Sequence, residues 1–281
     1  MDQECETSKG LPHLFLASHH KAGTVWMLST FFRIANANGY RWVHLNTGEP
    51  AWTIREDKLE YFETQRAVVE GESDKPGMFV DFHSAVPDLS RCKAERGIGG
   101  IHMVRDPRDM ILSAIRFHLN ADEAWLYEAN PAFGGLSYQQ KLASYDMIED
   151  QIRFELDHFM GKAIREMGSF DGQGWGYRKE RFEKYEELIL DVDMMLWHEL
   201  MVGLGLGGRD LIRAIKAFWE SSVFGDMKNA AASGTHKHIR DGRARQWETQ
   251  LSDEGLGLIE DAFGDVIVGL GYPLAGQREI V

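Results

Sequence analysis

Short apolar runs alternate with longer amphipathic stretches along the chain, and this alternation predicts its secondary structure. Runs of strand length occur at residues 13–17, 41–45, 78–82, 101–104 and 181–185. Apolar positions recur with the period of a helix after Pro107 and over residues 24–36, 136–167, 211–219 and 256–270. Strands that alternate with helices are typical of a mainly parallel sheet covered by helices on both faces. We therefore predict a three-layer α/β/α sandwich.

Composition places the chain among ordinary globular proteins. Hydrophobic residues make up 43% and charged residues 27% of its 281 residues, and no linker rich in proline, serine or glycine divides it. No internal repeat of about 20–50 residues occurs, which excludes solenoid and propeller folds. We expect one domain over residues 1–281, in which the charged helical stretch at residues 119–180 is an insertion.

Charge and cysteine content narrow the classes of function. The chain carries 31 basic and 44 acidic side chains, a net charge of −13, which argues against a nucleic-acid binder that works by neutralising phosphates. Cys5 and Cys92 are too few for a disulfide framework. Residues 1–10 do not resemble a secretory signal, and no apolar run approaches the roughly 18 residues that suggest a membrane span. We expect a cytoplasmic protein that contacts neither membrane nor nucleic acid.

The segment over residues 14–26 has the pattern of an anion-binding site. An apolar strand runs into a short turn that contains Lys21 and Gly23, and a helix begins directly afterwards. This order places free backbone N–H groups and the positive end of a helix around one point. The spacing of a nucleotide-triphosphate P-loop is absent. The alternative interpretation is a plain strand–turn–helix with an exposed lysine.

A second segment, over residues 100–113, has the pattern of a phosphate-binding site. Arg105 comes where a strand ends, and Ser113 follows about two turns into the next helix. A guanidinium in this place can bind a phosphate with two donors, and a serine hydroxyl can add a third. The alternative interpretation is a solvated, salt-bridged start of a helix, formed by Arg105, Asp106, Arg108 and Asp109.

Together the two segments resemble the sulfotransferases that use 3′-phosphoadenosine-5′-phosphosulfate (PAPS). The first motif of that family, approximately P-K-S-G-T-T-W, is similar to His20-Lys21-Ala22-Gly23-Thr24-Val25-Trp26. The second, approximately R-N-P-x-D with a serine eight residues after the arginine, is similar to Arg105-Asp106-Pro107-Arg108-Asp109 and Ser113.

Three later segments extend the resemblance, and all five occur in the order of the family. Residues 184–188 resemble its Y-E-D-L segment, and residues 224–229 resemble its F-x-x-M-K-x-N segment. Arg240-Asp241-Gly242, with Trp247 beyond it, resembles a degraded R-K-G-x-x-G-x-W. The resemblance implies a P-loop NTPase-like fold and PAPS-dependent sulfuryl transfer to a small-molecule acceptor, with 3′-phosphoadenosine 5′-phosphate (PAP) as product and no metal.

The resemblance also implies roles for individual residues. The backbone amides from Lys21 to Val25 would hold the 5′ phosphosulfate, with the Lys21 side chain at the bridging oxygen. Arg105 and Ser113 would bind the 3′ phosphate, assisted by the late loop with Arg240, Asp241 and Gly242. Tyr185 and Phe224 match positions that border the adenine, although ordinary core packing would also explain both rings. Trp26 matches a motif position and also fits a core residue.

The chain departs from the family pattern at three positions, two in the motifs above and one in a further segment of the family, K-x-H. Ala22 replaces a serine, which removes a hydroxyl but leaves the amide. Asp241 replaces a lysine near the 3′ phosphate, where Arg243 and Arg245 are neighbouring cations. Asp81 replaces the lysine of the family's K-x-H segment.

The acceptor needs a base, and the resemblance places it at His83, which matches the histidine of that K-x-H segment. An imidazole has a suitable pKa to remove a hydroxyl proton at neutral pH. His19 and His20, beside Lys21, are rival bases. A hydrogen-bonded histidine at the end of a strand is the alternative interpretation of His83.

Two other classes of function compete with this interpretation. A P-loop-like small-molecule kinase would share the strand–turn–helix anion site, and a catalytically silent nucleotide-binding module would share the motifs without turnover.

The sequence contains neither a zinc site nor the elbow motif of serine hydrolases. His236 and His238 lack the companion ligands of a zinc site, and no serine-hydrolase elbow is present.

The charge distribution bears on the acceptor. Residues 119–204 hold 17 acidic and 8 basic side chains, so 9 of the 13 net negative charges lie there. This acid would repel a polyanionic acceptor and concentrate a small cation, such as a guanidinium alkaloid sulfated on a hydroxyl or nitrogen. The alternative interpretation is that the carboxylates only solvate helix surfaces, namely Asp146, Glu149, Asp150, Glu155 and Asp157.

Overall fold

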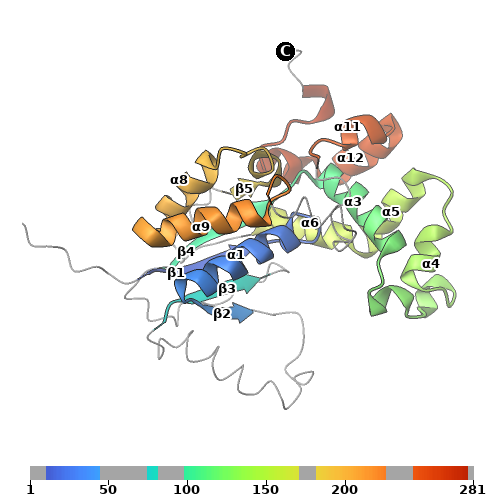
Figure 1. Cartoon of the computed structure of the whole chain (residues 1–281). Helices are drawn as coiled ribbons and strands as arrows, with labels where there is room; N and C mark the ends of the chain where they lie inside the picture. The colour runs from blue at the N-terminus through green and yellow to red at the C-terminus, as the bar shows by residue number, and fades with distance from the viewer. Residues whose placement is uncertain (1–10, 45–74, 82–97, 171–181, 226–242, 278–281) are drawn as a thin grey trace, which may run out of the picture.

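A sheet of five parallel strands lies at the centre of the fold, in the order β2-β3-β1-β4-β5 (Figure 1). The structure is a computed structural model and describes residues 11–44, 75–81, 98–170, 182–225 and 243–277. The strands are β1 (His13–Ala17), β2 (Arg41–His44), β3 (Gly77–Asp81), β4 (Ile98–Val104) and β5 (Phe182–Lys184). All five coincide with the predicted apolar runs to within three residues at either end.

The order of the strands places a binding edge at their carboxyl ends. β1 pairs with β3 on one side, where Ala17 lies beside Asp81, and with β4 on the other, where Ala17 lies beside His102. After β1 the chain first completes one side of the sheet, with β2 at the edge and β3 between β2 and β1, and then crosses to the other side to form β4 and β5. In parallel sheets with such a reversal, ligands bind outside the carboxyl ends of the strands on either side of it. Both sequence motifs begin at this edge.

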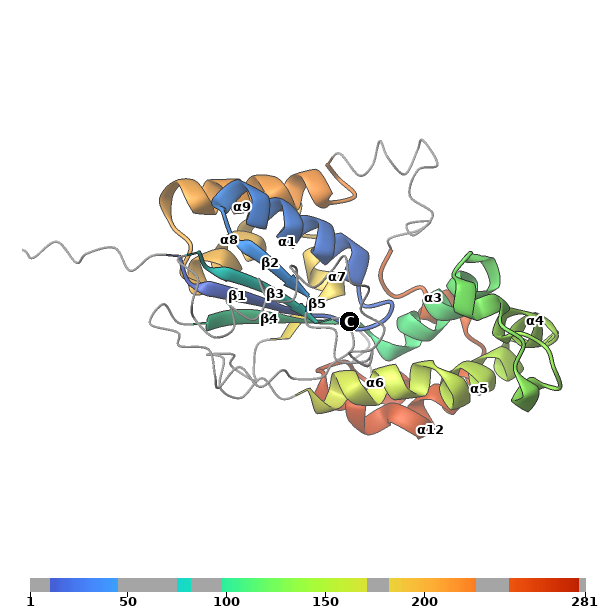
Figure 2. The same cartoon turned by 90° about the horizontal axis from the view of Figure 1, so that it is seen from below.

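One face of the sheet is covered by α1 (Thr24–Asn38), α7 (Tyr185–Leu188), α8 (Met195–Gly203) and α9 (Gly208–Ser221), as Figure 2 shows for α1, α8 and α9. Leu14 and Leu16 point to this face because side chains alternate along a strand. Under the helices, the Trp197 and Phe218 rings stack with centroids 4.4 Å apart. These residues form the larger of the two main hydrophobic clusters.

The second layer of helices comprises α3 (Pro107–Asn120), α5 (Ile148–His158), α6 (Met160–Ser169) and α12 (Asp253–Gly269), with the short α11 (Trp247–Gln250) beside α3. In Figure 2, α6 and α12 lie on the opposite side of the sheet from α1 and α9. Their shared cluster includes Ile111, Ile152, Ile164 and Ile259, all fully buried. The predicted three-layer sandwich is confirmed.

The helical stretch predicted over residues 136–167 is three helices. α4 (Tyr138–Ala143) begins at a capping box in which Ser137 and Gln140 satisfy each other's backbone N–H groups. α5 and α6 are separated at Phe159, whose φ of −145° is not helical. The remaining short elements are η4 (Ala124–Tyr127), η5 (Pro131–Phe133) and η6 (Ala275–Gln277).

Packing explains why β4 extends beyond its predicted range of residues 101–104. The strand begins at Ile98 and includes Gly99 and Gly100, which are poor strand formers in isolation. A Cβ atom on Gly99 would lie 2.9 Å from the Leu204 side chain, and one on Gly100 would lie 3.2 Å from the Phe15 side chain. The two glycines thus allow close approach of neighbouring elements.

Among the described helices, none is long and apolar enough to cross a membrane.

A carboxylate outside α8 fixes the start of that helix. Asp191 accepts hydrogen bonds from the backbone N–H groups of Leu196 (3.0 Å) and Trp197 (2.8 Å), two of the donors that a helix leaves unsatisfied in its first turn. We expect Asp191→Ala to lower the free energy of unfolding by about 1–3 kcal/mol, because both donors are part-buried or buried. Urea unfolding followed by circular dichroism measures this loss.

Asp193→Ala is the matched control for this prediction. Among the described residues, the exposed Asp193 accepts a single hydrogen bond, a longer one of 3.3 Å from the Met195 N–H group. Its removal should change the free energy of unfolding by less than the removal of Asp191. Equal losses in the two variants would contradict the capping role of Asp191.

Candidate functional site

The loop between β1 and α1 presents backbone donors at the carboxyl edge of the sheet. The Ala22 N–H group donates to the His19 carbonyl (3.0 Å), and Lys21 and Gly23 both have positive φ angles, of 66° and 93°. Gly23 is the N-cap residue of α1, whose first turn has neither a side-chain cap nor an acidic residue. The positive end of α1 and its first N–H groups thus remain available to an anion.

Two hydroxyl groups tie the ends of this loop together. The Thr24 hydroxyl donates to the His19 carbonyl at 2.7 Å. Since a hydroxyl has only one proton to give, the 2.8 Å contact between Ser18 and Thr24 is a bond donated by Ser18. The loop is therefore closed by side chains from both of its ends, which holds its amides in place.

Gly23 is required where Tyr185 approaches the loop. A Cβ atom on Gly23 would lie 2.9 Å from Cδ2 of Tyr185, the first residue of α7. The φ of 93° is also one that residues with a side chain rarely adopt. The ring of Tyr185 consequently packs directly on the turn between β1 and α1.

Arg105 joins this loop to the second motif. Its Nη1 atom donates to the Lys21 carbonyl (3.1 Å), its Nη2 atom lies 3.7 Å from Oδ2 of Asp109, and its guanidinium lies 4.4 Å from the centroid of the Tyr185 ring. The side chain is 7% exposed. Its Nε–H group is buried and has no hydrogen-bond partner in the part of the chain that the structure describes. The geometry therefore brings Lys21, Arg105 and Tyr185 together around one point.

The Lys21 ammonium group lies over the ring of Phe117, with Nζ 3.9 Å from the centroid. The pKa of Lys21 is lowered to about 8, mainly by burial and then by the positive charge of Arg105, with Glu123 opposing both. Within the described ranges, no carboxylate lies within ion-pair distance of Nζ. A buried cation in this state stabilises an anion placed beside it.

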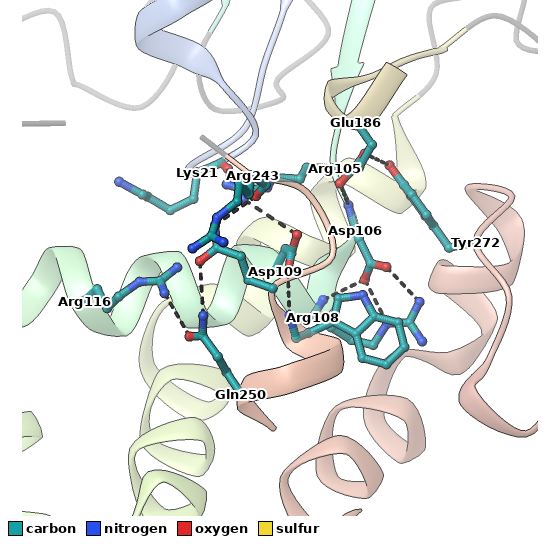
Figure 3. A network of polar contacts seen from close by, with 12 residues as sticks. Lys21, Arg105, Asp106, Arg108, Asp109, Arg116, Glu186, Arg243, Gln250 and Tyr272 are labelled. Carbon is teal, nitrogen blue, oxygen red and sulfur yellow. Dashed lines mark hydrogen bonds and ion pairs between the residues drawn. The ribbon is translucent and has the colours of Figure 1, made fainter. Parts of the chain in front are cut away.

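The start of α3 is a buried network of charges, shown in Figure 3. Arg108 donates to both carboxylate oxygens of Asp106 (2.9 and 2.7 Å) and to Oε1 of Glu260 on α12 (2.7 Å), and its guanidinium stacks 3.7 Å from the Trp247 ring centroid. Only 1% of Arg108 is exposed. The interpretation of this segment as a solvated helix start is therefore wrong, because α11 and α12 cover it.

Two more carboxylates of this network connect distant segments. Oδ1 of Asp109 accepts the Trp247 N–H group (3.0 Å), while Glu186 accepts the Asp106 N–H group (3.1 Å) and the Tyr272 hydroxyl (2.7 Å). Burial raises the pKa of both carboxyl groups. Figure 3 places Arg243, one of the cations near the altered late motif, beside Arg105 and Asp109. The network thus holds the late segment against the start of α3.

Other predicted residues lie at varying distances from this centre. Ser113 is half-buried on α3, four residues after Asp109 and so on the same helix face. Trp26 is a core residue whose ring contacts Tyr185 and Phe218 at centroid distances of 6.0 and 5.3 Å, and Phe224 packs against Phe218 at 6.2 Å. Ala22 is buried and Val25 is exposed.

Several predicted residues lie outside the described part of the chain, so the structure does not place them. They are the expected base His83, the late-loop residues Arg240, Asp241 and Gly242, and the pair His236 and His238. Within the described part, no group of three or more metal-ligating side chains gathers.

The rival bases His19 and His20 have different surroundings. The Nε2 atoms of His19 and His102 are 2.6 Å apart, both rings are buried, and burial together with His19 holds the pKa of His102 well below its usual value. His20 is half-buried, and its ring stacks on His118 with centroids 5.1 Å apart. His19 is thus fixed within the protein, while His20 lies beside the helical region.

Sequence reasoning missed the structural roles of Arg108 and Glu186. Arg108 occupies a variable position of the second motif, and Glu186 lies inside the Y-E-D-L-like segment beside Tyr185. No local signal distinguishes Arg108 from a surface arginine, because its partners come from residues 106, 247 and 260. For Glu186, the motif itself was the available signal.

The family model described as sulfotransferase domain matches residues 11–271. A crystal structure of mouse sulfotransferase SULT7A1 complexed with PAP is similar in fold, with a TM-score of 0.55 and 17% sequence identity over 94% of this chain and 87% of that chain. No curated protein sequence matches the chain.

Substitution of Gly23 tests the packing of the anion-binding turn. We expect Gly23→Ala to lower the free energy of unfolding by about 1–3 kcal/mol, since the new Cβ meets Tyr185 and the backbone is strained. Gly39→Ala is the matched control, because Gly39 also has a positive φ (76°) but has open space around its Cβ position. Urea unfolding should show the larger loss for Gly23→Ala. Equal losses would mean that contact with Tyr185 adds nothing.

Proposed function

The chain belongs to the sulfotransferase domain family, and we propose that it transfers a sulfuryl group from PAPS to a hydroxyl or nitrogen of a small-molecule acceptor. The observation that carries this proposal is the coupling of Arg105 to the Lys21 carbonyl beside the uncapped start of α1. This contact sets the Arg105 guanidinium and the positive end of α1 at a fixed separation along one edge of the sheet. A molecule with anionic groups at two places, such as PAPS, matches this arrangement.

The described residues fit such a ligand. The amides from Lys21 to Val25 would hold the phosphosulfate end at the positive end of α1. The buried Nε–H group of Arg105 is a donor with no partner among the described residues, and we assign it with Ser113 to the 3′ phosphate. Tyr185 and Phe224 would border the adenine. Arg240, Asp241 and Gly242, which lie outside the described residues, would assist in binding the 3′ phosphate.

In this proposal, Lys21 acts on the charge that develops during transfer. PAPS supplies the sulfuryl group, and transfer resembles phosphoryl transfer in passing through a loose, in-line transition state. The Lys21 ammonium and the loop amides are held in place before the reaction, so they stabilise charge on the leaving oxygen without reorganisation. His83 would remove the proton from the acceptor. No step of the proposal uses a metal.

The acidity of the helical region supports a cationic acceptor. Of the five carboxylates considered as surface solvation, Asp146 and Asp157 are exposed, whereas Glu149 and Glu155 are buried. Surface solvation is therefore the wrong interpretation for these two. Both have partners within the protein, since Glu155 contacts His118 and Tyr138 and Glu149 accepts the Ser252 hydroxyl. The support for a cationic acceptor is therefore the net negative charge of residues 119–204. We propose an amine or guanidinium compound as the acceptor.

Ligand-induced stabilisation tests the cofactor. PAP should raise the melting temperature more than ATP or AMP does, because binding to the folded state alone stabilises it. Since AMP is PAP without its 3′ phosphate, we expect Arg105→Ala to remove most of the difference between PAP and AMP. Differential scanning fluorimetry with the three nucleotides measures both effects.

Arg213→Ala is the control for the loss of an arginine. Arg213 lies on α9 with its side chain 42% exposed, so the preference for PAP should survive its removal. A preference for ATP would support the kinase interpretation. If Arg105→Ala still prefers PAP as strongly as the parent, the assignment of the 3′ phosphate is wrong.

Substitution of Lys21 tests its role in transfer. We expect Lys21→Ala to lower kcat by about 100-fold or more, and to lower the affinity for PAP far less, because its charge acts mainly on the transition state. Turnover is measured with tyramine, 4-ethylphenol and 3-(4-hydroxyphenyl)propionate as acceptors. Lys162→Ala, at an exposed lysine of α6, is the control and should behave as the parent does. Near-normal turnover by Lys21→Ala would remove Lys21 from the mechanism.

A further inference from the structure

A histidine and a glutamate form a fully buried pair in the helical region. Nδ1 of His118, near the end of α3, lies 2.6 Å from Oε1 of Glu155 on α5, and neither side chain is exposed. The other oxygen of Glu155 accepts the Tyr138 hydroxyl at 3.0 Å. Three helices therefore contribute one residue each to a hydrogen-bonded chain.

The contact with Glu155 determines how the imidazole is protonated. A carboxylate that accepts the Tyr138 hydroxyl has only acceptor oxygens, so Nδ1 of His118 carries the proton of the shared bond. In the neutral imidazole, the lone pair is then on Nε2. Carboxylates orient imidazoles in this way in catalytic and metal sites.

Within this hydrogen-bonded group of His118, Glu155 and Tyr138, the Nε2 atom of His118 has no explained role. It is buried, and among the residues that the structure describes it has no hydrogen-bond partner. An unsatisfied buried polar atom lowers stability, and in native proteins it often marks a functional position. A purely structural pair between α3 and α5 would account for Nδ1 and Glu155 but not for a lone pair directed away from both.

Aromatic rings surround His118 on the remaining sides. Ring centroids lie 5.0–5.6 Å from its own, and the rings belong to His20, Phe117, Trp125, Tyr138 and Phe159. His20, Phe117, Trp125 and Phe159 are themselves only half-buried. The rings that contact His118 therefore also reach the surface of the protein.

This pair lies next to the residues assigned to sulfuryl transfer. His20 stacks on His118 and precedes Lys21 in the chain, and Lys21 lies over the ring of Phe117, the neighbour of His118 on α3. Close by, the Trp125 Nε1–H group donates to Glu123 at 2.7 Å. The surroundings thus combine aromatic faces with the carboxylates of Glu123 and Glu155.

We propose that His118 recognises the acceptor: its Nε2 atom accepts a hydrogen bond from the N–H group of an ammonium or guanidinium, and Glu155 is the positioning residue that holds the proton of the neutral imidazole on Nδ1. When the imidazole is neutral, the pair carries the one negative charge of Glu155, which favours a cationic donor over an anionic one. The surrounding rings bind the same cation through their faces. The inference rests on the proposed function, because the acceptor site is defined by its place beside Lys21.

Binding of matched probes tests the proposal. Tyramine and 4-ethylphenol share a phenol ring and differ by an ammonium group, so the ratio of their affinities isolates that group. In calorimetry with the PAP-bound protein, we expect tyramine to bind about ten-fold or more tightly than 4-ethylphenol, the usual effect of a charged hydrogen bond. 3-(4-Hydroxyphenyl)propionate, the anionic counterpart, should bind most weakly.

Two variants separate recognition from packing. His118→Asn keeps a donor near the position of Nδ1 and deletes Nε2, so it should lose the preference for tyramine while PAP and 4-ethylphenol bind within about two-fold of the parent. His158→Asn is the matched control, since His158 also contacts aromatic rings, those of Phe133 and Phe154, but is exposed. It should keep the preference for tyramine.

A spectroscopic measurement on the unaltered protein covers the case in which His118→Asn does not fold. The ¹⁵N resonances of His118 should show a proton on Nδ1, and the Nε2 resonance should shift when tyramine is added. No preference for tyramine in the parent, the same loss in both variants, or an unchanged Nε2 resonance would each overturn the proposal. Absence of PAP binding would count against the proposed function instead, and repeating the tyramine titration without PAP still decides the role of His118.

Discussion

The burial of two arginines at the end of β4 is the constraint on which the site depends. Arg105 and Arg108 are nearly inaccessible to water, and a buried guanidinium requires partners for its charge and its donors. Those partners come from the loop after β1, the start of α3, the ring of Tyr185, and α12. If one of these segments were displaced, an uncompensated charge would be left inside the protein. The arginines therefore fix the relative positions of segments that are far apart in the sequence.

This dependence explains why the anion-binding loop has a defined shape. Its carbonyl at Lys21 accepts from Arg105, its glycine leaves room for Tyr185, and its two ends are joined through Thr24. The loop amides at the start of α1 are thus oriented before any ligand arrives. Preorganisation of this kind allows a site to stabilise developing charge without rearranging. The same contacts leave Lys21 half-buried with little compensation for its charge, which lowers its pKa and favours an anionic neighbour.

Helix α3 links two chemically different environments. At its beginning, Asp106, Arg108 and Asp109 belong to the charged network around Arg105. Near its end, Phe117 contacts Lys21 on one side, and His118 turns toward Glu155 in the helical region. One rigid helix therefore sets the distance between the basic edge of the sheet and the acidic region beside it. The proposed transfer needs such a fixed separation, because it places the donor at the basic edge and the acceptor beside the acidic region.

The sequence by itself determined the strands, the main helices and the anion-binding turn. These depend on local properties: the periodicity of apolar residues, the φ angle of Gly23 and the proline that begins α3. The order of five short motifs also indicated the family, although each motif taken alone has an ordinary structural explanation.

Only the tertiary structure decided which charges are buried. Arg108 and Glu155 look like surface residues of charged helices, and nothing within a few positions of either distinguishes them. Arg108 is buried because α11 and α12, more than a hundred residues later, cover the start of α3. Glu155 is buried because α5 packs against α3 and α4, which brings it to His118 and Tyr138. Burial is a property of the neighbours that packing supplies, and a local sequence pattern does not specify those neighbours.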